Sequence, residues 1–220
     1  MTKNCKTCDQ PFEAPDDPVL SRFMFFCLTC SNNHQAADQK VSRDRANQER
    51  ESRWRSLCPP AYRDTVIESL PTPAKAQEIL AWNYGAKGLL LHGKTRRGKS
   101  RCAWLLCRKV FELGKSIRVL DSMAGFQYAS AFANSGREAQ EWVDSRCKCG
   151  LLFFDDVFKV KLTDSFEAAV FAIVDYRLAH NLPILATLND TGDTLAARMS
   201  ADRGEAFVAR LKEMCHLIHF

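Results

Sequence analysis

One short loop constrains this chain more than any other feature of its sequence. Residues 93–100 read G-K-T-R-R-G-K-S, a complete G-x-x-x-x-G-K-S pattern. An apolar run over 88–92 comes before the loop and helix-forming residues follow it. This strand–loop–helix order is the context in which such a loop binds phosphate, because backbone N–H groups and the helix dipole both favour an anion there. The sequence therefore predicts a nucleotide-binding loop.

The residue types in the loop indicate its chemistry. Lys99 is predicted to reach the β- and γ-phosphate oxygens, and the Ser100 hydroxyl is predicted to hold Mg²⁺. The expected ligands are thus ATP and Mg²⁺. The predicted nucleotide contacts are Gly93, Lys94, Thr95, Arg96, Arg97, Gly98, Lys99, Ser100 and Arg101. The alternative is a glycine-containing turn beside a basic helix start.

Length and composition agree with a globular protein. A chain of 220 residues can hold one full domain and a small appendage, and its 46% hydrophobic content is ample for a core. No apolar run approaches the roughly 20 residues of a membrane span, and the N-terminus lacks the apolar segment of a secretory signal. We therefore expect a cytoplasmic protein with no membrane contact. A net charge of +5 permits nucleic-acid binding without requiring it.

Four of the ten cysteines form two identical pairs near the N-terminus. Cys5 and Cys8 make one C-x-x-C pair, Cys27 and Cys30 make the other, and eighteen residues separate the pairs. This is the spacing of a four-cysteine zinc site, and four thiolates favour a structural ion over a catalytic one. An apolar run over 23–26 is predicted to be a strand. The sequence thus predicts a zinc-ribbon-like domain over 1–34, folded by its Zn²⁺.

Residues 35–60 differ sharply from their surroundings. Glycine and proline are absent from 35–57, and arginine dominates the charges, so we expect a polar, basic helix that ends at 58–60. One interpretation is a solvated linker. The other is a surface that contacts DNA phosphates, with a tryptophan available for stacking. The candidate DNA contacts are Arg43, Arg45, Arg50, Arg53, Trp54 and Arg55.

From residue 61 to 220 the pattern alternates between helix and strand. Alternation of this kind predicts an α/β fold with a parallel sheet, helices on both faces, and a ligand at the carboxyl ends of the strands. The predicted strands are 89–92, 116–120, 151–154, 183–188 and 215–220. The predicted helices are 73–84, 99–113, 124–133, 137–146, 165–180 and 207–214.

Two carboxylates follow the third predicted strand. Residues 151–154 are all apolar, and Asp155 and Asp156 come directly after them. A buried central strand would therefore deliver both acids to the sheet edge at which the phosphate loop lies, as a Walker B element does. We predict that Asp155 holds Mg²⁺ and that Asp156 orients or deprotonates the attacking water.

Over 59–220 the chain resembles the DnaC/IstB-like group of AAA+ ATPases, which includes helicase loaders and transposition helpers. The resemblance rests on the segments 88–93, 93–100, 151–156, 184–189 and 204–211. It implies that Asn189 is the sensor 1 residue, which contacts the γ-phosphate or the lytic water. It also implies that Arg210 is an arginine finger acting on a neighbouring subunit, with Arg203 and Arg198 as rivals.

The chain departs from the family pattern in three ways. Arg96 stands where family loops usually carry glycine, and Asp156 stands where AAA+ proteins more often carry glutamate. One methylene less could misplace the water by about 1 Å, which can cost roughly 100-fold in rate, so we expect slow hydrolysis. No helical lid follows the last predicted strand, which matches the lidless members of this group.

Taken together, these features predict a zinc-ribbon-like domain, a basic helical linker and a lidless AAA+ core. The resemblance implies a homo-oligomeric ATPase that loads or remodels a partner, a replicative hexameric helicase, on single-stranded DNA in a bacterial or phage-infected cell. A transposition helper that binds DNA directly is the first alternative. The second is a zinc-dependent adaptor that binds nucleotide with little hydrolysis.

Overall fold

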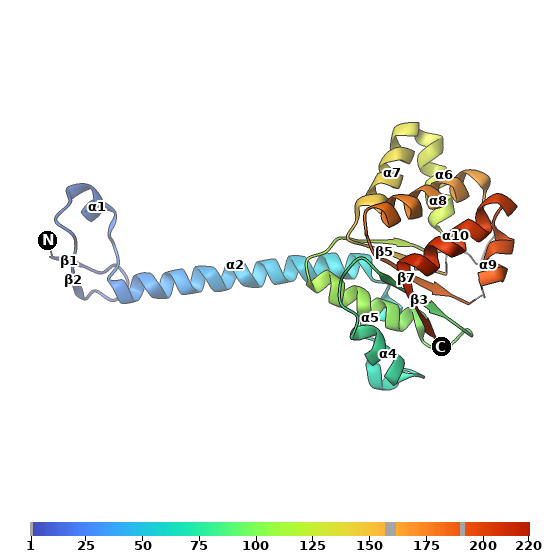
Figure 1. Ribbon diagram of the computed structural model, residues 1–220. Helices are drawn as coiled ribbons and strands as arrows, with labels where there is room; N and C mark the ends of the chain where they lie inside the picture. Colours follow the sequence, from blue (N-terminus) through green and yellow to red (C-terminus); the bar gives the residue numbers. More distant parts are fainter. Residues whose placement is uncertain (1, 157–161, 190–191) are drawn as a thin grey trace. The chain divides into compact units, whose positions relative to one another are not determined.

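The computed structural model describes residues 2–156, 162–189 and 192–220, and it divides the chain into two compact units that meet between Leu57 and Cys58 (Figure 1). Residue 34, the predicted end of the zinc-binding domain, lies inside the helix α2, Leu28–Leu57. None of the helices in the described part of the chain is both long and apolar enough to cross a membrane.

The first unit begins with a small hairpin and a short helix. Strand β1, Thr2–Asn4, pairs antiparallel with β2, Pro11–Glu13. Helix α1, Pro18–Phe23, starts at the Asp17 carboxylate, which accepts hydrogen bonds from the next backbone N–H groups and so caps the helix. The prediction of a strand over 23–26 was wrong: Phe23 ends α1, and the next three residues belong to no strand.

Helix α2 is polar on all sides. Of its thirty residues only Cys30 and Trp54 are buried. Exposed ion pairs one turn apart line its surface, such as Arg45 with Glu49 at 3.1 Å. A helix without an apolar stripe has little to pack against, so these local pairs and its uninterrupted helix-forming sequence support it.

The second unit is built on a five-stranded parallel sheet, as predicted. Its order is β4-β5-β6-β3-β7, so the strand that precedes the phosphate loop lies between β6 and β7. The strands are β3 (Gly88–His92), β4 (Ile117–Leu120), β5 (Leu151–Asp155), β6 (Ile184–Leu188) and β7 (Cys215–His219). Helices cover both faces of this sheet (Figure 1).

The six predicted helices of the second unit are present in order with different ends, and α3, η1 and α9 were not predicted. They are α3 (Pro60–Arg63), a 3-10 turn η1 (Ile67–Ser69), α4 (Pro73–Leu80), α5 (Lys99–Glu112), α6 (Ala124–Asn134), α7 (Gly136–Lys148), α8 (Asp164–Ala179), α9 (Gly192–Arg198) and α10 (Ala201–Met214). Helix α4 stops four residues before the predicted end. Helix α10 starts six residues before the predicted start.

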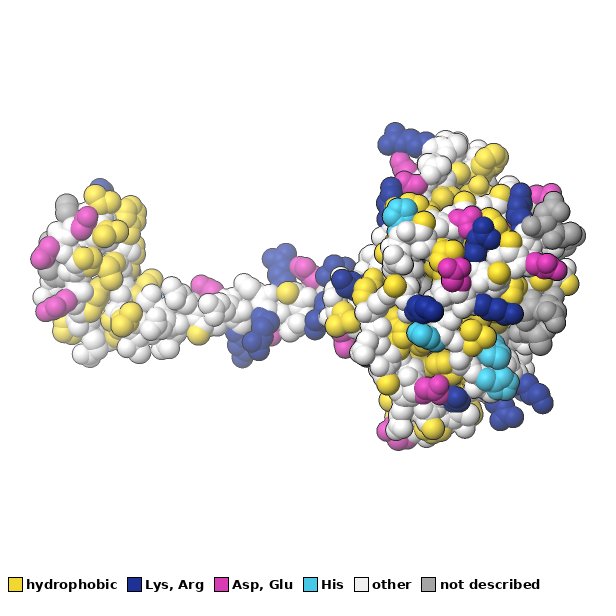
Figure 2. Space-filling model, in the orientation of Figure 1, with side chains coloured by type: hydrophobic (Ala, Val, Ile, Leu, Met, Phe, Trp, Pro, Cys, Tyr) yellow, Lys and Arg dark blue, Asp and Glu magenta, His cyan; other side chains and the backbone are white. Residues whose placement is uncertain are grey.

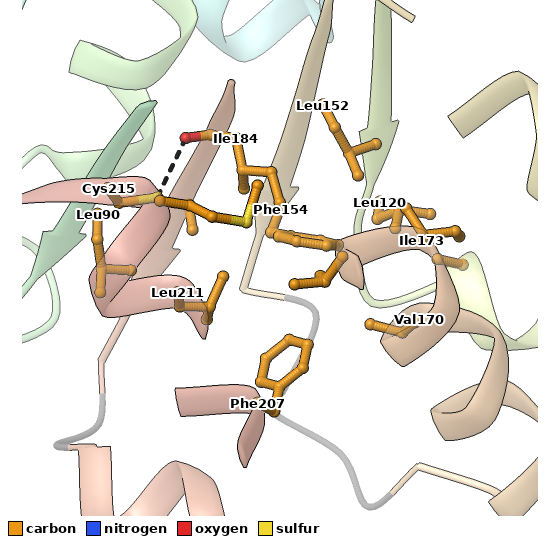
Figure 3. Packing of buried hydrophobic residues seen from close by; sticks show 14 of the residues in the cluster. Leu90, Leu120, Leu152, Phe154, Val170, Ile173, Ile184, Phe207, Leu211 and Cys215 are labelled. Atoms are coloured by element: carbon orange, nitrogen blue, oxygen red, sulfur yellow. Dashed lines mark hydrogen bonds between the residues drawn. The ribbon is translucent and has the colours of Figure 1, made fainter. Parts of the chain in front are cut away.

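The main core lies between the sheet and helices α8 and α10. Figure 3 shows Phe154 of β5 among apolar side chains from these helices, including Val170, Ile173 and Phe207, all of which are fully buried. The Cys215 thiol donates to the Ile184 carbonyl at 3.4 Å, so this cysteine is a packing residue of the sheet. Interiors packed in this way fix the strand positions, and hence the residues at the strand ends.

One arginine is buried completely at the opposite end of the sheet from the phosphate loop. Arg177 of α8 donates hydrogen bonds of 2.6–3.4 Å to five backbone carbonyls. These carbonyls belong to Arg146, Cys147, Cys149, Gly150 and Pro183. The guanidinium therefore joins the end of α7 to the segments that enter β5 and β6.

Candidate nucleotide site and cysteine cluster

The phosphate loop joins β3 to α5 and depends on its two glycines. Gly93 and Gly98 have φ values of +133° and +91°, which favour glycine. A Cβ on Gly93 would also lie 2.3 Å from the Phe220 carbonyl oxygen. Arg96 has a φ of +59°, a left-handed conformation that costs a non-glycine residue about 1 to 3 kcal/mol. This explains physically why glycine suits that position.

Lys99 is bound to its own loop. Its side chain is 5% exposed, and Nζ donates to the carbonyls of Gly93 at 2.7 Å and Lys94 at 2.8 Å. Phosphate oxygens would be stronger acceptors for the same ammonium group, because hydrogen bonds between ions are stronger than those to neutral carbonyls. The loop thus holds the Lys99 ammonium group where phosphate oxygens can replace the two carbonyls as its hydrogen-bond acceptors.

The two predicted magnesium residues lie in direct contact. Ser100 Oγ donates to Asp155 Oδ1 at 2.8 Å, and the buried Thr187 hydroxyl of β6 donates to the same oxygen at 2.9 Å. The pKa of Asp155 is raised, chiefly by burial and also by the Asp156 charge. The hydrogen bonds from both hydroxyls oppose this rise. A serine hydroxyl beside a buried carboxylate is a donor set that fits Mg²⁺, which prefers oxygen ligands.

Asp156 and Asn189 form a second pair at the same sheet edge. Asn189 Nδ2 donates to Asp156 Oδ1 at 2.9 Å, and the Asp156 backbone N–H donates to Thr187 Oγ1 at 3.2 Å. Asp156 has a φ of +54°, so the chain turns sharply as it leaves β5. Thr187 was not among the predicted site residues. The signal for it was a single hydroxyl in the otherwise apolar strand β6.

Two hollows flank the loop. The first has a volume of about 360 Å³ and is lined by Tyr62, Pro71, Thr95, Arg96, Arg97, Gly98, Lys99, Ser100, Arg101, Asp156 and Asn189. The second, of about 490 Å³, is lined by Thr72, His92, Gly93, Lys94, Arg97, Asn189, His219 and Phe220. All nine predicted nucleotide contacts therefore line one or both hollows. Most of the charged groups are cationic, as a phosphate ligand requires.

The arginine predicted as a finger is engaged within its own subunit. Arg210 Nε donates to the Asp175 carboxylate of α8, and its guanidinium lies 4.4 Å from the centre of the Phe171 ring. Its rival Arg203 is more exposed, at 40% of its side chain, and lies 3.7 Å from the buried Glu167. Glu167 also accepts hydrogen bonds from the backbone N–H and hydroxyl of Ser200. The Arg203 side chain is therefore less tightly bound within its own subunit than the Arg210 side chain.

The four N-terminal cysteines converge. The Sγ atoms of Cys5, Cys8, Cys27 and Cys30 all lie within 4.8 Å of one another, and none forms a disulfide. The Cys5 backbone N–H donates to the Gln10 carbonyl at 2.9 Å, which closes the first C-x-x-C turn. Four thiols gathered from two such turns form a donor set that fits tetrahedral zinc.

The candidate DNA contacts divide into two groups. The five arginines are exposed, and two of them, Arg45 and Arg55, pair with glutamates of the same helix. Trp54 is only 4% exposed, so its ring is not presented for stacking on a base. We therefore omit Trp54 from the candidate DNA surface.

Comparison with known proteins finds a likeness in fold. No known protein-family profile matches the chain, and no curated protein matches its sequence. Solved structures do match its fold. The fold of the chain is similar to that of DnaI and of the DnaC helicase loader, which agrees with the fold that the resemblance implies.

Three matches illustrate the likeness. A structure of DnaI aligns at 19% identity and a TM-score of 0.55 over 67% of this chain and 82% of that one. The DnaC helicase loader aligns at 18% identity and a TM-score of 0.56 over 76% of this chain and 98% of that one. The replication initiator DnaA, bound to AMPPCP and single-stranded DNA, aligns at 14% and 0.58 over 74% of this chain but half of its own.

Proposed function

We propose that this protein is an ATPase that loads or remodels a replicative helicase on single-stranded DNA. The observation that carries the ATPase part is the cluster at the carboxyl ends of β3, β5 and β6. There Ser100 contacts Asp155 and Asn189 contacts Asp156, beside a complete phosphate loop. The fold likeness to DnaI and to the DnaC helicase loader supports the loading role.

Each side chain of the cluster has a distinct task in this proposal. Lys99 exchanges its loop carbonyls for phosphate oxygens. Ser100 and Asp155 hold Mg²⁺, which neutralises charge on the β- and γ-phosphate oxygens when bound. Asp156 accepts a proton from the attacking water, and Asn189 holds the Asp156 carboxylate in place. Because aspartate is shorter than the usual glutamate, we expect turnover to be slow.

The test of the ATPase assignment uses two substitutions with different expected effects. Lys99→Ala should weaken ATP binding, because the ammonium group is lost. Asp156→Asn should keep binding and reduce turnover by about 100-fold or more, as expected for loss of a general base. Calorimetry and phosphate release measure the two separately. If Asp156→Asn hydrolyses ATP as fast as the unchanged protein, the catalytic assignment is wrong.

Assembly through the ATP site is part of the proposal. An arginine supplied by a neighbouring subunit can raise hydrolysis by about 10³- to 10⁵-fold. Mixing Lys99→Ala protein with an arginine variant should then restore some turnover, since each mixed interface can contain one intact site. Arg210→Ala is the first variant to mix, and Arg203→Ala is the second. Rescue by only one of them identifies the finger.

The first unit is the proposed site of partner recruitment. Six apolar side chains are exposed on α1, on the segment that follows it and at the first residue of α2, namely Val19, Leu20, Phe23, Met24, Phe25 and Leu28. Figure 2 shows hydrophobic side chains gathered on this unit. Exposed apolar patches of this kind mark protein–protein contacts. Phe23, which is 72% exposed, should be central to the contact.

Pull-down from a bacterial extract distinguishes a helicase partner from a transposase partner. The proposal expects a replicative helicase to be retained by the unchanged protein and lost with Phe23→Ser, while the exposed control Val41→Ser retains it. Retention of a transposase in its place would favour the transposition helper. Nucleotide binding without measurable hydrolysis would favour the zinc-dependent adaptor.

The arginines of α2 are the proposed DNA contacts. Neutralising Arg43 and Arg50 should reduce the slope of log K against log salt for single-stranded DNA by about 1 to 2, since each phosphate contact contributes about 0.7 to 0.9. An unchanged slope would leave α2 as a plain solvated linker.

A further inference from the structure

The second hollow beside the phosphate loop contains a pair of histidines that the proposed ATPase mechanism does not use. His92 is the last residue of β3, and His219 is the last residue of β7. These strands are parallel neighbours, and the two histidines are partners in their register. The rings meet edge to face, with centroids 5.0 Å apart and an interplanar angle of 80°. Both line the hollow of about 490 Å³, at the edge where the loop begins.

The backbone around this pair holds the end of β7 against the loop. The Phe220 N–H donates to the His92 carbonyl at 2.9 Å. A Cβ on Gly93 would lie 2.3 Å from the Phe220 carbonyl oxygen, so only glycine allows this close approach. The position of His219 beside the phosphate loop is therefore fixed by main-chain contacts.

The charged side chains that line the second hollow are cationic. Lys94 and Arg97, both exposed, line it together with the amide of Asn189 and the hydroxyl of Thr72. Among the described residues, no carboxylate lines this hollow, and neither cation has an ion-pair partner. Cations gathered in a hollow without an acid favour an anionic ligand.

The electrostatics at His92 agree with this excess of positive charge. Burial lowers the pKa of His92, and the charges of His219 and Lys99 lower it further. His92 is therefore a neutral imidazole near pH 7, which offers one ring N–H as a hydrogen-bond donor. An anion in the hollow would offset the repulsion among these groups.

We infer that the second hollow binds a phosphate group that does not belong to the bound nucleotide, with His92, His219 and Lys94 as its hydrogen-bond donors. Hydrogen bonds from such donors to an anionic oxygen are stronger than those between neutral groups. Arg97 and Asn189 line both hollows, so this phosphate would lie next to the nucleotide. The inference goes beyond the proposed function, because it adds a second ligand.

The two hollows have different linings and can be occupied at the same time. Ser100 and Asp156, which the proposed function assigns to Mg²⁺ and to catalysis, line only the first hollow. The two histidines line only the second. Two sources carry the inferred phosphate chemistry, namely free inorganic phosphate, which hydrolysis also releases, and the backbone of a DNA strand.

The chain offers a matched pair of variants. His219→Phe keeps an aromatic ring against His92 and removes the ring nitrogens. His216→Phe makes the same change on the same strand, at an exposed residue that does not line the hollow. Both variants remove one histidine from β7, so a general effect on the strand should be similar in the two.

Calorimetric titration of inorganic phosphate into the full chain, saturated with ADP and Mg²⁺, tests the inference. Saturation keeps the phosphate loop occupied, so the probe reports the second hollow. The unchanged protein and His216→Phe should bind phosphate, and His219→Phe should lose about 10-fold or more of that affinity, because hydrogen bonds to charged groups are the stronger class. ADP affinity should be equal in all three proteins.

Three results would overturn the inference. They are no phosphate binding to the ADP-loaded protein, equal phosphate affinity in His219→Phe and His216→Phe, and a loss of ADP affinity in His219→Phe, which would place the nucleotide itself in the second hollow. If the unchanged protein binds no ADP, the proposed function fails. Phosphate binding that His219→Phe weakens and His216→Phe preserves would then still support the inference.

A short oligothymidylate, titrated into the same ADP-loaded proteins, identifies the source of the phosphate. If a strand supplies it, His219→Phe should weaken oligonucleotide binding by a similar factor, and inorganic phosphate should compete with the strand. If free phosphate is the ligand, the oligonucleotide should bind His219→Phe and His216→Phe equally. Each of these results supports a phosphate site in the second hollow, provided that His219→Phe weakens the binding of inorganic phosphate.

Discussion

The two units of the chain differ in what they bury. In the described part of the first unit, five side chains are buried, and two of them are the cysteines Cys5 and Cys30. The second unit buries nearly every residue of β3, β5 and β6, together with the inner faces of its helices. A segment that buries so little apolar surface needs another source of folding free energy. The comparison teaches that packing accounts for the second unit, whereas the first unit has little packing and instead gathers four thiols that fit zinc.

Removing the metal should have the largest effect and should be confined to the first unit. Zinc in sites of this kind contributes about 10 to 16 kcal/mol of apparent binding free energy, which is also folding free energy. Chelation, or Cys27→Ser, should therefore unfold the hairpin and α1 while the core keeps its ADP affinity. Amide hydrogen exchange measured by residue would detect this, with the exposed Gln10→Ala as the control. Protection of the hairpin that survives in metal-free protein would break the comparison.

Replacing the buried arginine should have the next largest effect, confined to the second unit. Arg177→Met should destabilise the core by about 3 to 5 kcal/mol, because several buried carbonyls lose their donor at about 1 to 3 kcal/mol each. Denaturant unfolding measures the loss, and zinc content should not change. Arg137→Met is the matched control, since the Arg137 side chain is 87% exposed and its single ion pair is worth little. Similar losses in both variants would refute the role given to Arg177.

A single added methyl group tests how tightly the second unit is packed. A Cβ at Gly204 would lie 2.3 Å from the Ala196 carbonyl oxygen, between α10 and α9. Gly204→Ala should therefore cost about 1 to 3 kcal/mol through overpacking. Gly136→Ala has open space around it at the start of α7 and should be neutral or slightly stabilising. Thermal unfolding of the two variants compares them directly.

The smallest effect should come from the exposed middle of α2, between its buried residues Cys30 and Trp54. Arg45→Ala removes an exposed ion pair with Glu49, worth about 0.3 to 0.5 kcal/mol. Arg43→Ala, on the same exposed helix, is the control. Circular dichroism of α2 at low and high salt should show a difference between the variants that disappears as salt rises. A larger loss would mean that α2 is held by more than its own local pairs.

Local patterns predicted most of the second unit. A complete loop motif, uniformly apolar strands and acids directly after a strand are features of adjacent residues, and the structure has Ser100 beside Asp155 as they indicate. The short apolar run over 23–26 was misread, because four apolar residues fit a strand and a helix end equally well.

Contacts between distant residues could not be read from the sequence. Thr187 of β6 contacts Asp155 of the neighbouring strand β5, and Arg210 of α10 contacts Asp175 of α8. Neither residue carries a local signal of its partner, since a threonine suits any strand and an arginine suits any exposed helix. These pairings follow from the strand order and the helix packing, which only the structure supplies.

The completely buried Arg177 gives the sheet two ends of different character. At the end where β5 and β6 begin, one guanidinium satisfies five carbonyls. At the other end, Arg96 and Asp156 both hold left-handed backbone conformations that the local sequence does not favour. Asn181 near the anchor also has a positive φ, but asparagine tolerates this conformation better than arginine does, so the most strained of these residues is Arg96, beside the candidate nucleotide site. A sheet anchored in this way can release strain at its ligand end on binding without loosening the anchor.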